Sequence, residues 1–225
     1  MGIRHKLSVL VFCIIASINA NAAEATPPEV TVDGLHLVKG TKMARVYAKP
    51  DVDLSQYNKF YVLAPQVAFE KDWQRKQNNI PGNTVTQDDM QRIKSELSAL
   101  FVEVFKQELQ DKGNYVLADD IAEDVLVVSP AIIDLYVVSP TTPRNRNSRS
   151  AIASVGSMTL YMELIDSVTG DKLVKAIDNK YDNSYPNPIR SNQKRNEAAA
   201  RELLGEWAEL LRLALDEARS VVGKN

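Results

Sequence analysis

Two long stretches with the apolar periodicity of an amphipathic helix frame a set of β-rich stretches, and this order constrains the fold more than any other feature. In residues 87–112 and 191–222 the large apolar side chains recur three and four positions apart, which predicts one buried face on each helix. Thr86 is a suitable N-cap for the first helix, and Gly113 suits a left-handed C-cap.

The stretches around and between the helices have the composition of strands. The predicted strands are residues 45–48, 59–64, 115–117, 124–139, 151–165 and 173–181. Both alternating faces of residues 124–139 are apolar, which predicts a central strand with Pro130 at a bulge or bend. Runs of strands flanked by helices indicate an α+β fold. We therefore predict a two-layer sandwich, with a mainly antiparallel sheet and the two long helices packed on one face.

The last two strands are expected to form a hairpin around the turn that begins at Asp166. Pairing Leu164 with Leu173 places Leu160 opposite Ile177 on the same buried face, a self-consistent register. In this register Asp178 falls on the polar side of its strand.

The amino terminus has the three parts of a secretory signal peptide. A basic start at Arg4–Lys6 is followed by the apolar run Leu7–Ile18 and by small residues at Ala20 and Ala22. The run is shorter than the roughly 20 residues that span a bilayer. We predict cleavage after Ala22, export to the periplasm, and no transmembrane segment after removal of the signal.

Cys13 is the only cysteine, and it raises the alternative of a lipid-anchored protein. Large side chains precede it and the apolar run continues beyond it, which argues against lipid attachment there. We divide the chain into a signal peptide (1–22), a flexible lead-in (23–43) and a single α+β domain (44–225). Loss of the signal moves the net charge from −2 to −4, because two bases and no acid are removed. An acidic domain of this kind is not expected to bind nucleic acid.

The predicted mature chain offers few groups for metal or cofactor chemistry. It keeps one histidine, His36, and no cysteine, whereas zinc, copper and iron sites need several such ligands. Glycine-rich phosphate loops and nucleophilic-serine motifs are absent. We expect no metal, no cofactor and no catalytic residue.

Carboxylates are the remaining route to catalysis. Asp134 interrupts an apolar strand, and Asp166 and Asp178 flank the hairpin, so an acid/base pair is conceivable. Asp166 is better explained as a turn residue, and Asp134 is the carboxylate to test because a buried one would need a partner. A carboxylate-dependent periplasmic hydrolase therefore stands as the alternative function.

Two surface features are candidates for binding a partner. Trp73 lies in a charged stretch and could anchor an interface, although folding back onto the domain is the simpler expectation. Residues 141–150 contain Arg144, Arg146 and Arg149 and no acid. Such a loop could attract an envelope protein or an anionic envelope surface, and its alternative is a solvated connector.

Several stretches resemble a family of exported bacterial proteins known as domain of unknown function 3313. The similar stretches are Ala44–Pro65, Asp124–Pro140, Met162–Tyr181 and the Trp207–Ala208 pair. The resemblance implies a bacterial envelope protein, often a lipoprotein among relatives, and brings no activity with it. Together with the residues, it favours a non-enzymatic binding or accessory module of the cell envelope.

Overall fold

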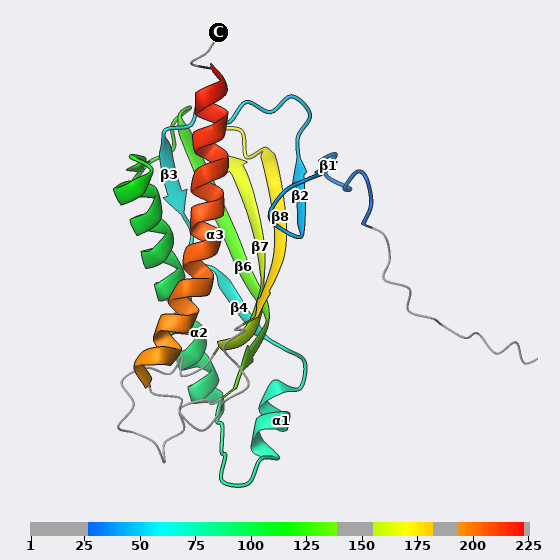
Figure 1. Cartoon of the computed structure of the whole chain (residues 1–225), viewed down its shortest axis with the longest axis vertical. Helices are drawn as coiled ribbons and strands as arrows, with labels where there is room; N and C mark the ends of the chain where they lie inside the picture. Colours follow the sequence, from blue (N-terminus) through cyan, green and yellow to red (C-terminus); the bar gives the residue numbers. More distant parts are fainter. Residues whose placement is uncertain (1–26, 139–154, 182–192, 223–225) are drawn as a thin grey trace, which may run out of the picture.

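The computed structural model describes residues 27–138, 155–181 and 193–222. Over these ranges the chain is a mixed α/β protein with a mainly antiparallel sheet and a few helices (Figure 1). Its elements are, in order, β1 (His36–Val38), β2 (Arg45–Ala48), β3 (Lys59–Val62), β4 (Gln66–Phe69), α1 (Trp73–Asn78), α2 (Gln87–Gln107), the π-helical turn η1 (Glu108–Lys112), β5 (Val116–Leu117), β6 (Val125–Val137), β7 (Val155–Asp166), β8 (Lys172–Tyr181) and α3 (Gln193–Val222).

The described strands form one sheet in the order β1–β2–β8–β7–β6–β3–β5, and β4 pairs with β6 beyond the end of β3. Strands β1, β2, β8, β7 and β6 are antiparallel, as predicted. Strands β3, β4 and β5 introduce parallel pairs. These arise because the chain leaves β4 through α2 and returns to β5 and β6, and such a crossover brings strands back in the same direction.

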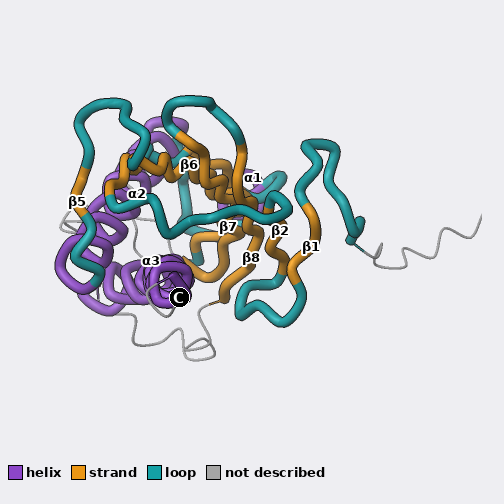
Figure 2. Tube along the Cα trace, turned by 90° about the horizontal axis from the view of Figure 1, so that it is seen from above, coloured by secondary structure: helices purple, strands orange, loops and turns teal. Residues whose placement is uncertain are grey.

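The core lies where α2 and α3 meet the sheet. The two helices pack against each other, α2 contacts β3 and β4, and α3 contacts β7. Viewed from above, both helices lie beside the strands (Figure 2). The alternating apolar positions of β7 are buried, as the sequence predicts. The largest fully buried side chains include Trp73, Trp207, Tyr57, Phe60, Phe101 and Phe105.

The first long helix begins as expected and ends differently. Thr86 forms a capping box with Asp89: each backbone N–H is held by the other side chain, at 3.0 and 3.1 Å. The predicted left-handed cap at Gly113 is wrong, because Gly113 has φ −93° and Asn114 takes the left-handed conformation at φ 53°. Glycine is needed at 113 for space instead, since a Cβ there would lie 2.5 Å from the ring of Tyr115.

Strand β6 is central, as predicted, but its irregularity is not at Pro130. The register with β7 shifts between Ile133 and Tyr136, and Asp134 has φ 51° at that bulge. Pro130 lies where β6 passes from pairing with β3 to pairing with β4. A missing N–H is tolerated there because neither short strand extends across the junction.

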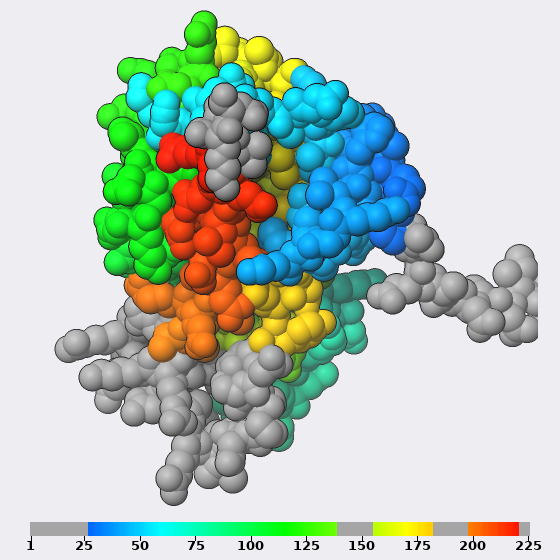
Figure 3. Space-filling model, turned by 45° about the horizontal axis from the view of Figure 1, so that its top comes forward, coloured from blue at the N-terminus to red at the C-terminus, as the bar shows by residue number. Residues whose placement is uncertain are grey.

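The predicted flexible lead-in contains ordered structure in its described part. β1 lies within it and pairs with β2, and Leu35 is buried. In the space-filling view this segment, in blue, lies against the body of the molecule (Figure 3). Residues 66–85, for which no helix or strand was predicted, contain β4 and α1.

The register predicted for the β7–β8 hairpin is wrong by one residue. Leu164 lies opposite Val174, and Leu160 lies opposite Asp178. Ile165 pairs with Lys172, so Leu173 is an extra residue between the two pairs. A one-residue slip exchanges the faces of a strand, and Asp178 is consequently buried.

Candidate functional site

Helix α1 is fixed to the end of the sheet by its first residue, Trp73. The indole Nε1 of Trp73 donates a hydrogen bond of 3.0 Å to the carbonyl of Val137, and Gln77 reaches the same oxygen at 3.3 Å. The ring of Trp73 stacks on Phe69, with centroids 4.2 Å apart. Trp73 is only 1% exposed, so it folds back onto the domain and does not face a partner in this conformation.

A cleft of about 450 Å³ lies between β4, α1 and α2. Phe69 forms part of its apolar wall together with Met90. Met90 and Lys94 are one helical turn apart on α2, so they face the cleft together. Because the capping box fixes the start of α2 about one turn before Met90 and two turns before Lys94, this wall is built on a firmly placed helix. The cleft is lined by Ala68, Phe69, Glu70, Asp72, Trp73, Gln74, Arg75, Met90 and Lys94.

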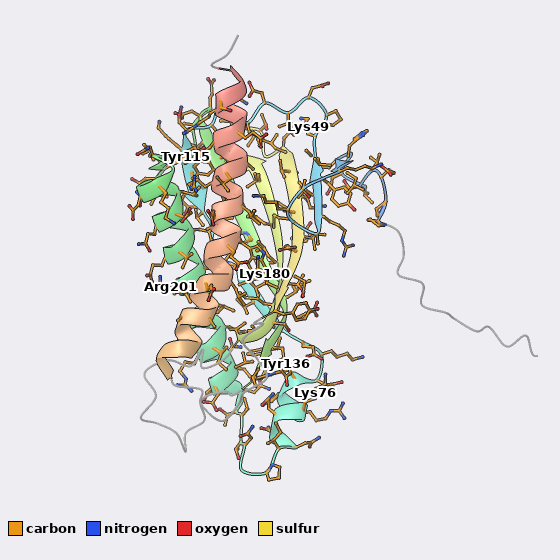
Figure 4. The ribbon with its side chains drawn as sticks, in the orientation of Figure 1. Lys49, Lys76, Tyr115, Tyr136, Lys180 and Arg201 are labelled. Carbon is orange, nitrogen blue, oxygen red and sulfur yellow. The ribbon has the colours of Figure 1, made fainter. Side chains whose placement is uncertain are left out.

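The charges around this cleft are paired except at one position. Lys76 pairs with Glu70, and Arg75 pairs with Asp72 at 3.1 Å. Figure 4 shows Lys76 on α1, at the end of the molecule that also holds Tyr136. Lys94 places its Nζ 5.9 Å from the centre of the Phe69 ring and makes no ion pair with any residue in the described ranges. The cleft therefore presents an aromatic wall beside an available cation.

A second, smaller cleft of about 270 Å³ lies between α2, η1 and α3. Two carboxylates, Glu108 and Asp111, line it. Glu108 is already engaged, because Arg212 Nε donates to it at 2.9 Å and Lys112 Nζ lies 2.8 Å away. Burial alone would raise the pKa of Glu108, but the hydrogen bonds from Lys112 and Arg212 outweigh it and hold that pKa below its ordinary value. This cluster joins η1 to α3, and we assign it to stability rather than to a ligand.

The candidate carboxylates have different surroundings, and no hydrogen bond joins any two of them within the described ranges. Asp178 accepts hydrogen bonds from Trp207 Nε1 at 2.8 Å and from the backbone N–H of Ala44 at 2.9 Å. Asp166 caps its turn as predicted, since it accepts the N–H groups that follow it, and it also accepts the hydroxyl of Tyr57 at 2.6 Å. Asp134 is exposed at the bulge of β6 and makes no hydrogen bond or ion pair with another described residue.

The hydrogen bond between Tyr57 and Asp166 serves the structure of the domain. The hydrogen bond from Tyr57 lowers the pKa of Asp166, with help from the turn N–H groups. Burial, followed by the bond to Asp166, raises the pKa of Tyr57 to about 12. Both groups therefore stay in their ordinary ionisation states at neutral pH. They hold the β7–β8 turn against the segment before β3.

The arginine loop lies outside the described residues. Arg144, Arg146 and Arg149 fall between Val138 and Val155, so their predicted role in binding stays a prediction. Within the described ranges no group of three or more histidine, cysteine, aspartate or glutamate side chains is placed to hold a metal ion. No described helix is both long and apolar enough to cross a bilayer.

The 450 Å³ cleft was not predicted from the sequence, although Trp73 in its lining was a candidate residue. Trp73 was expected either to anchor an interface or, more simply, to fold back onto the domain. It folds back and anchors the wall of the cleft. Phe69 comes from β4, whereas Met90 and Lys94 come from α2. The four-residue spacings of Phe69 with Trp73 and of Met90 with Lys94 were the available signals.

Solved structures of similar shape come from several bacteria. They include the PelC dodecamer of Paraburkholderia phytofirmans (13% identity, TM-score 0.38, 74% of this chain and 96% of that one). Protein XCC0632 of Xanthomonas campestris has 12% identity and a TM-score of 0.41, with 76% and 93% covered. A DUF4136 family protein of Bacteroides thetaiotaomicron has 12% identity and a TM-score of 0.33, with 73% and 95% covered. At these values we draw nothing about function from the likenesses.

No curated protein is detectably similar in sequence. Residues 33–211, most of the chain, match the family described as protein of unknown function (DUF3313). The match begins just before β1 and ends within α3, so it takes in every strand of the sheet. The chain belongs to the DUF3313 family of proteins of unknown function.

Proposed function

We propose that this chain is a non-enzymatic binding or accessory module of the bacterial cell envelope. The observation that carries the proposal is how the domain uses its buried polar groups. Asp178 and Glu108 are bonded to structural donors. In the described part of the chain every buried side-chain nitrogen or oxygen has a hydrogen-bond partner. A catalytic centre normally keeps such groups available to a substrate.

The same proposal takes the domain as a two-layer sandwich in which α2 and α3 share one face of the sheet. Contacts of α2 with β3 and β4, and of α3 with β7, support this arrangement. Fully buried residues such as Leu126, Ile132 and Leu160 fill the space between helices and strands. A filled interior favours recognition at the surface over chemistry in an internal cleft.

The proposed location follows from the amino-terminal sequence. The basic start, short apolar run and Ala20–Ala22 exit predict export with cleavage after Ala22 and without lipid at Cys13. Partners in this setting would be an envelope protein or, through the arginine loop, an anionic envelope surface. The alternative of a carboxylate hydrolase gains no support from the described residues, since Asp134 is exposed and has no partner there.

The proposal is tested with the full chain, expressed from its own signal and tagged at the carboxyl end. We expect chemical crosslinking in cells to give one reproducible complex that fractionates with the envelope. We also expect the parent protein to hydrolyse ester, phosphoester, glycoside or peptide substrates no faster than the Asp134→Asn variant does. Hydrolysis that is lost in Asp134→Asn, or the absence of any specific complex, would overturn the proposal.

A further inference from the structure

The two edges of the sheet differ in what covers them. At the β1 edge, Val30 bridges to His36, and the N–H of Leu37 donates to the carbonyl of Glu29 at 2.8 Å. The chain's own residues therefore occupy the outer side of β1. At the opposite edge, β5 pairs with β3 only, and no described strand pairs with the outer side of β4.

Within the described part of the chain, the backbone groups of β4 without a hydrogen-bond partner belong to Val67 and Phe69. The N–H of Glu70 points to β6, where it donates to the carbonyl of Leu135 at 3.0 Å. Backbone groups alternate in direction along a strand, so those of Val67 and Phe69 are directed away from β6. The strand, Gln-Val-Ala-Phe, contains neither the charge nor the proline that commonly protects an edge.

The 450 Å³ cleft lies along this same edge. Its lining includes both Ala68 and Phe69, which are neighbours in β4 and point to opposite faces of the sheet. A cleft that touches both faces of a strand lies against the edge of that strand. Unsatisfied backbone groups and a recess for side chains are thus presented side by side.

The chemistry of the cleft selects the side chains of an incoming strand. Phe69 and Met90 offer apolar contact. Lys94 has no carboxylate partner in the described ranges, while Glu70 and Asp72 are already neutralised by Lys76 and Arg75. A peptide that complements this cleft would therefore carry an apolar side chain next to an acidic one.

We propose that the outer edge of β4 and the adjoining cleft bind an extended peptide segment of a partner protein, with an acidic residue received by Lys94. The peptide adds a strand to the sheet through the backbone of Val67 and Phe69, a mode that gives affinity from the main chain and specificity from the pockets. The inference rests on the proposed binding function and names its site.

The test uses a phage-displayed library of random nonapeptides, selected on the purified full chain without its signal. The most enriched sequence is then synthesised with a fluorescein label and titrated by fluorescence anisotropy. We expect enriched sequences to carry an acid near an aromatic or aliphatic residue. Lys94→Glu should weaken binding about tenfold or more, because it replaces an attraction by a repulsion. Lys106 is a half-buried lysine of the same helix that lies outside the cleft. The control variant Lys106→Glu should therefore bind the peptide as tightly as the parent protein does.

Hydrogen exchange separates strand addition from simple side-chain binding. We expect the amides of Val67 and Phe69 to gain protection when the labelled peptide is bound. Peptides without acidic enrichment, equal binding by Lys94→Glu, or unprotected amides at both positions would overturn the site. If crosslinking in cells still captures the same partner with Lys94→Glu, the proposed function survives and only this site is lost.

Discussion

Replacing each of the two tryptophans by phenylalanine should cost unequal amounts of stability. Trp73 and Trp207 are both buried, and both donate an indole N–H to an oxygen inside the protein. They differ in the acceptor. Trp207 donates to the carboxylate of Asp178, whereas Trp73 donates to the neutral carbonyl of Val137.

The difference in free energy of unfolding follows from these acceptors. Hydrogen bonds to charged groups contribute about 1.5–3 kcal/mol and neutral ones about 0.5–1.5 kcal/mol. The loss of volume is the same in both variants, so it largely cancels. The carbonyl of Val137 also keeps its bond from Gln77 at 3.3 Å, while among the described residues Asp178 keeps only the N–H of Ala44. We expect Trp207→Phe to cost about 1–2 kcal/mol more than Trp73→Phe.

Urea denaturation at pH 7 followed by circular dichroism measures both variants without relying on tryptophan fluorescence. Asp178→Asn and its combination with Trp207→Phe complete a double-mutant cycle. The amide places N–H groups against a donor, so the pair should be non-additive by about 1 kcal/mol. Equal costs for the two tryptophan variants, or an additive cycle, would refute the role given to Asp178.

Four further outcomes are expected. Gly113→Ala should lower the free energy of unfolding by about 1–3 kcal/mol, because the new Cβ would lie 2.5 Å from the ring of Tyr115. Gly205→Ala should raise it by about 1 kcal/mol in the same urea assay, since position 205 lies inside helix α3 and a Cβ there would meet no other described part of the chain within 4 Å. Glu108→Gln should destabilise the domain by about 2 kcal/mol at pH 7. Because its folded pKa lies below the ordinary 4.5, that stabilisation is present above 4.5 and the gap to the parent should close as pH falls through the folded value. Intact mass of the exported protein should correspond to cleavage after Ala22 with no lipid.

The two long helices and the central strand were predictable because their signals are local. In α2 the buried positions Ile93, Leu97, Leu100 and Val104 repeat at helical spacing, and the capping box is written in consecutive residues. The alternating positions of β7 are likewise buried as their pattern predicts. Such patterns predict the buried positions reliably because each helix or strand buries its own apolar face.

The register of the hairpin was not predictable from the same evidence. After the turn the sequence Leu173–Ile177 has apolar residues on both alternating faces, so either face could have been assigned to the core. Leu173 is absorbed as an extra residue, and the remaining strand is shifted by one position. Asp178 then reaches Trp207 across the interior, a contact between segments that no local pattern relates.

The end of α2 shows a different limit. Glycine after a helical pattern normally signals a left-handed cap, but the π-helical turn η1 widens the last turn and delays the change of direction to Asn114. Gly113 is then required by the packing of Tyr115. The sequence therefore places a glycine near the end of the helix for a reason other than the one predicted: Gly113 makes room for Tyr115, and this contact is visible only in the tertiary structure.

The open edge at β4 also arises from features outside the strand itself. β6 is 13 residues long, whereas β3 and β4 have 4 residues each and β5 has 2. Pro65 divides β3 from β4, and its carbonyl is held by the hydroxyl of Ser98 on α2 at 3.1 Å. β5 pairs with the start of β3 and continues no further. A peptide strand at β4 would therefore extend the sheet without displacing any strand pair of the described chain, so binding there need not break existing structure.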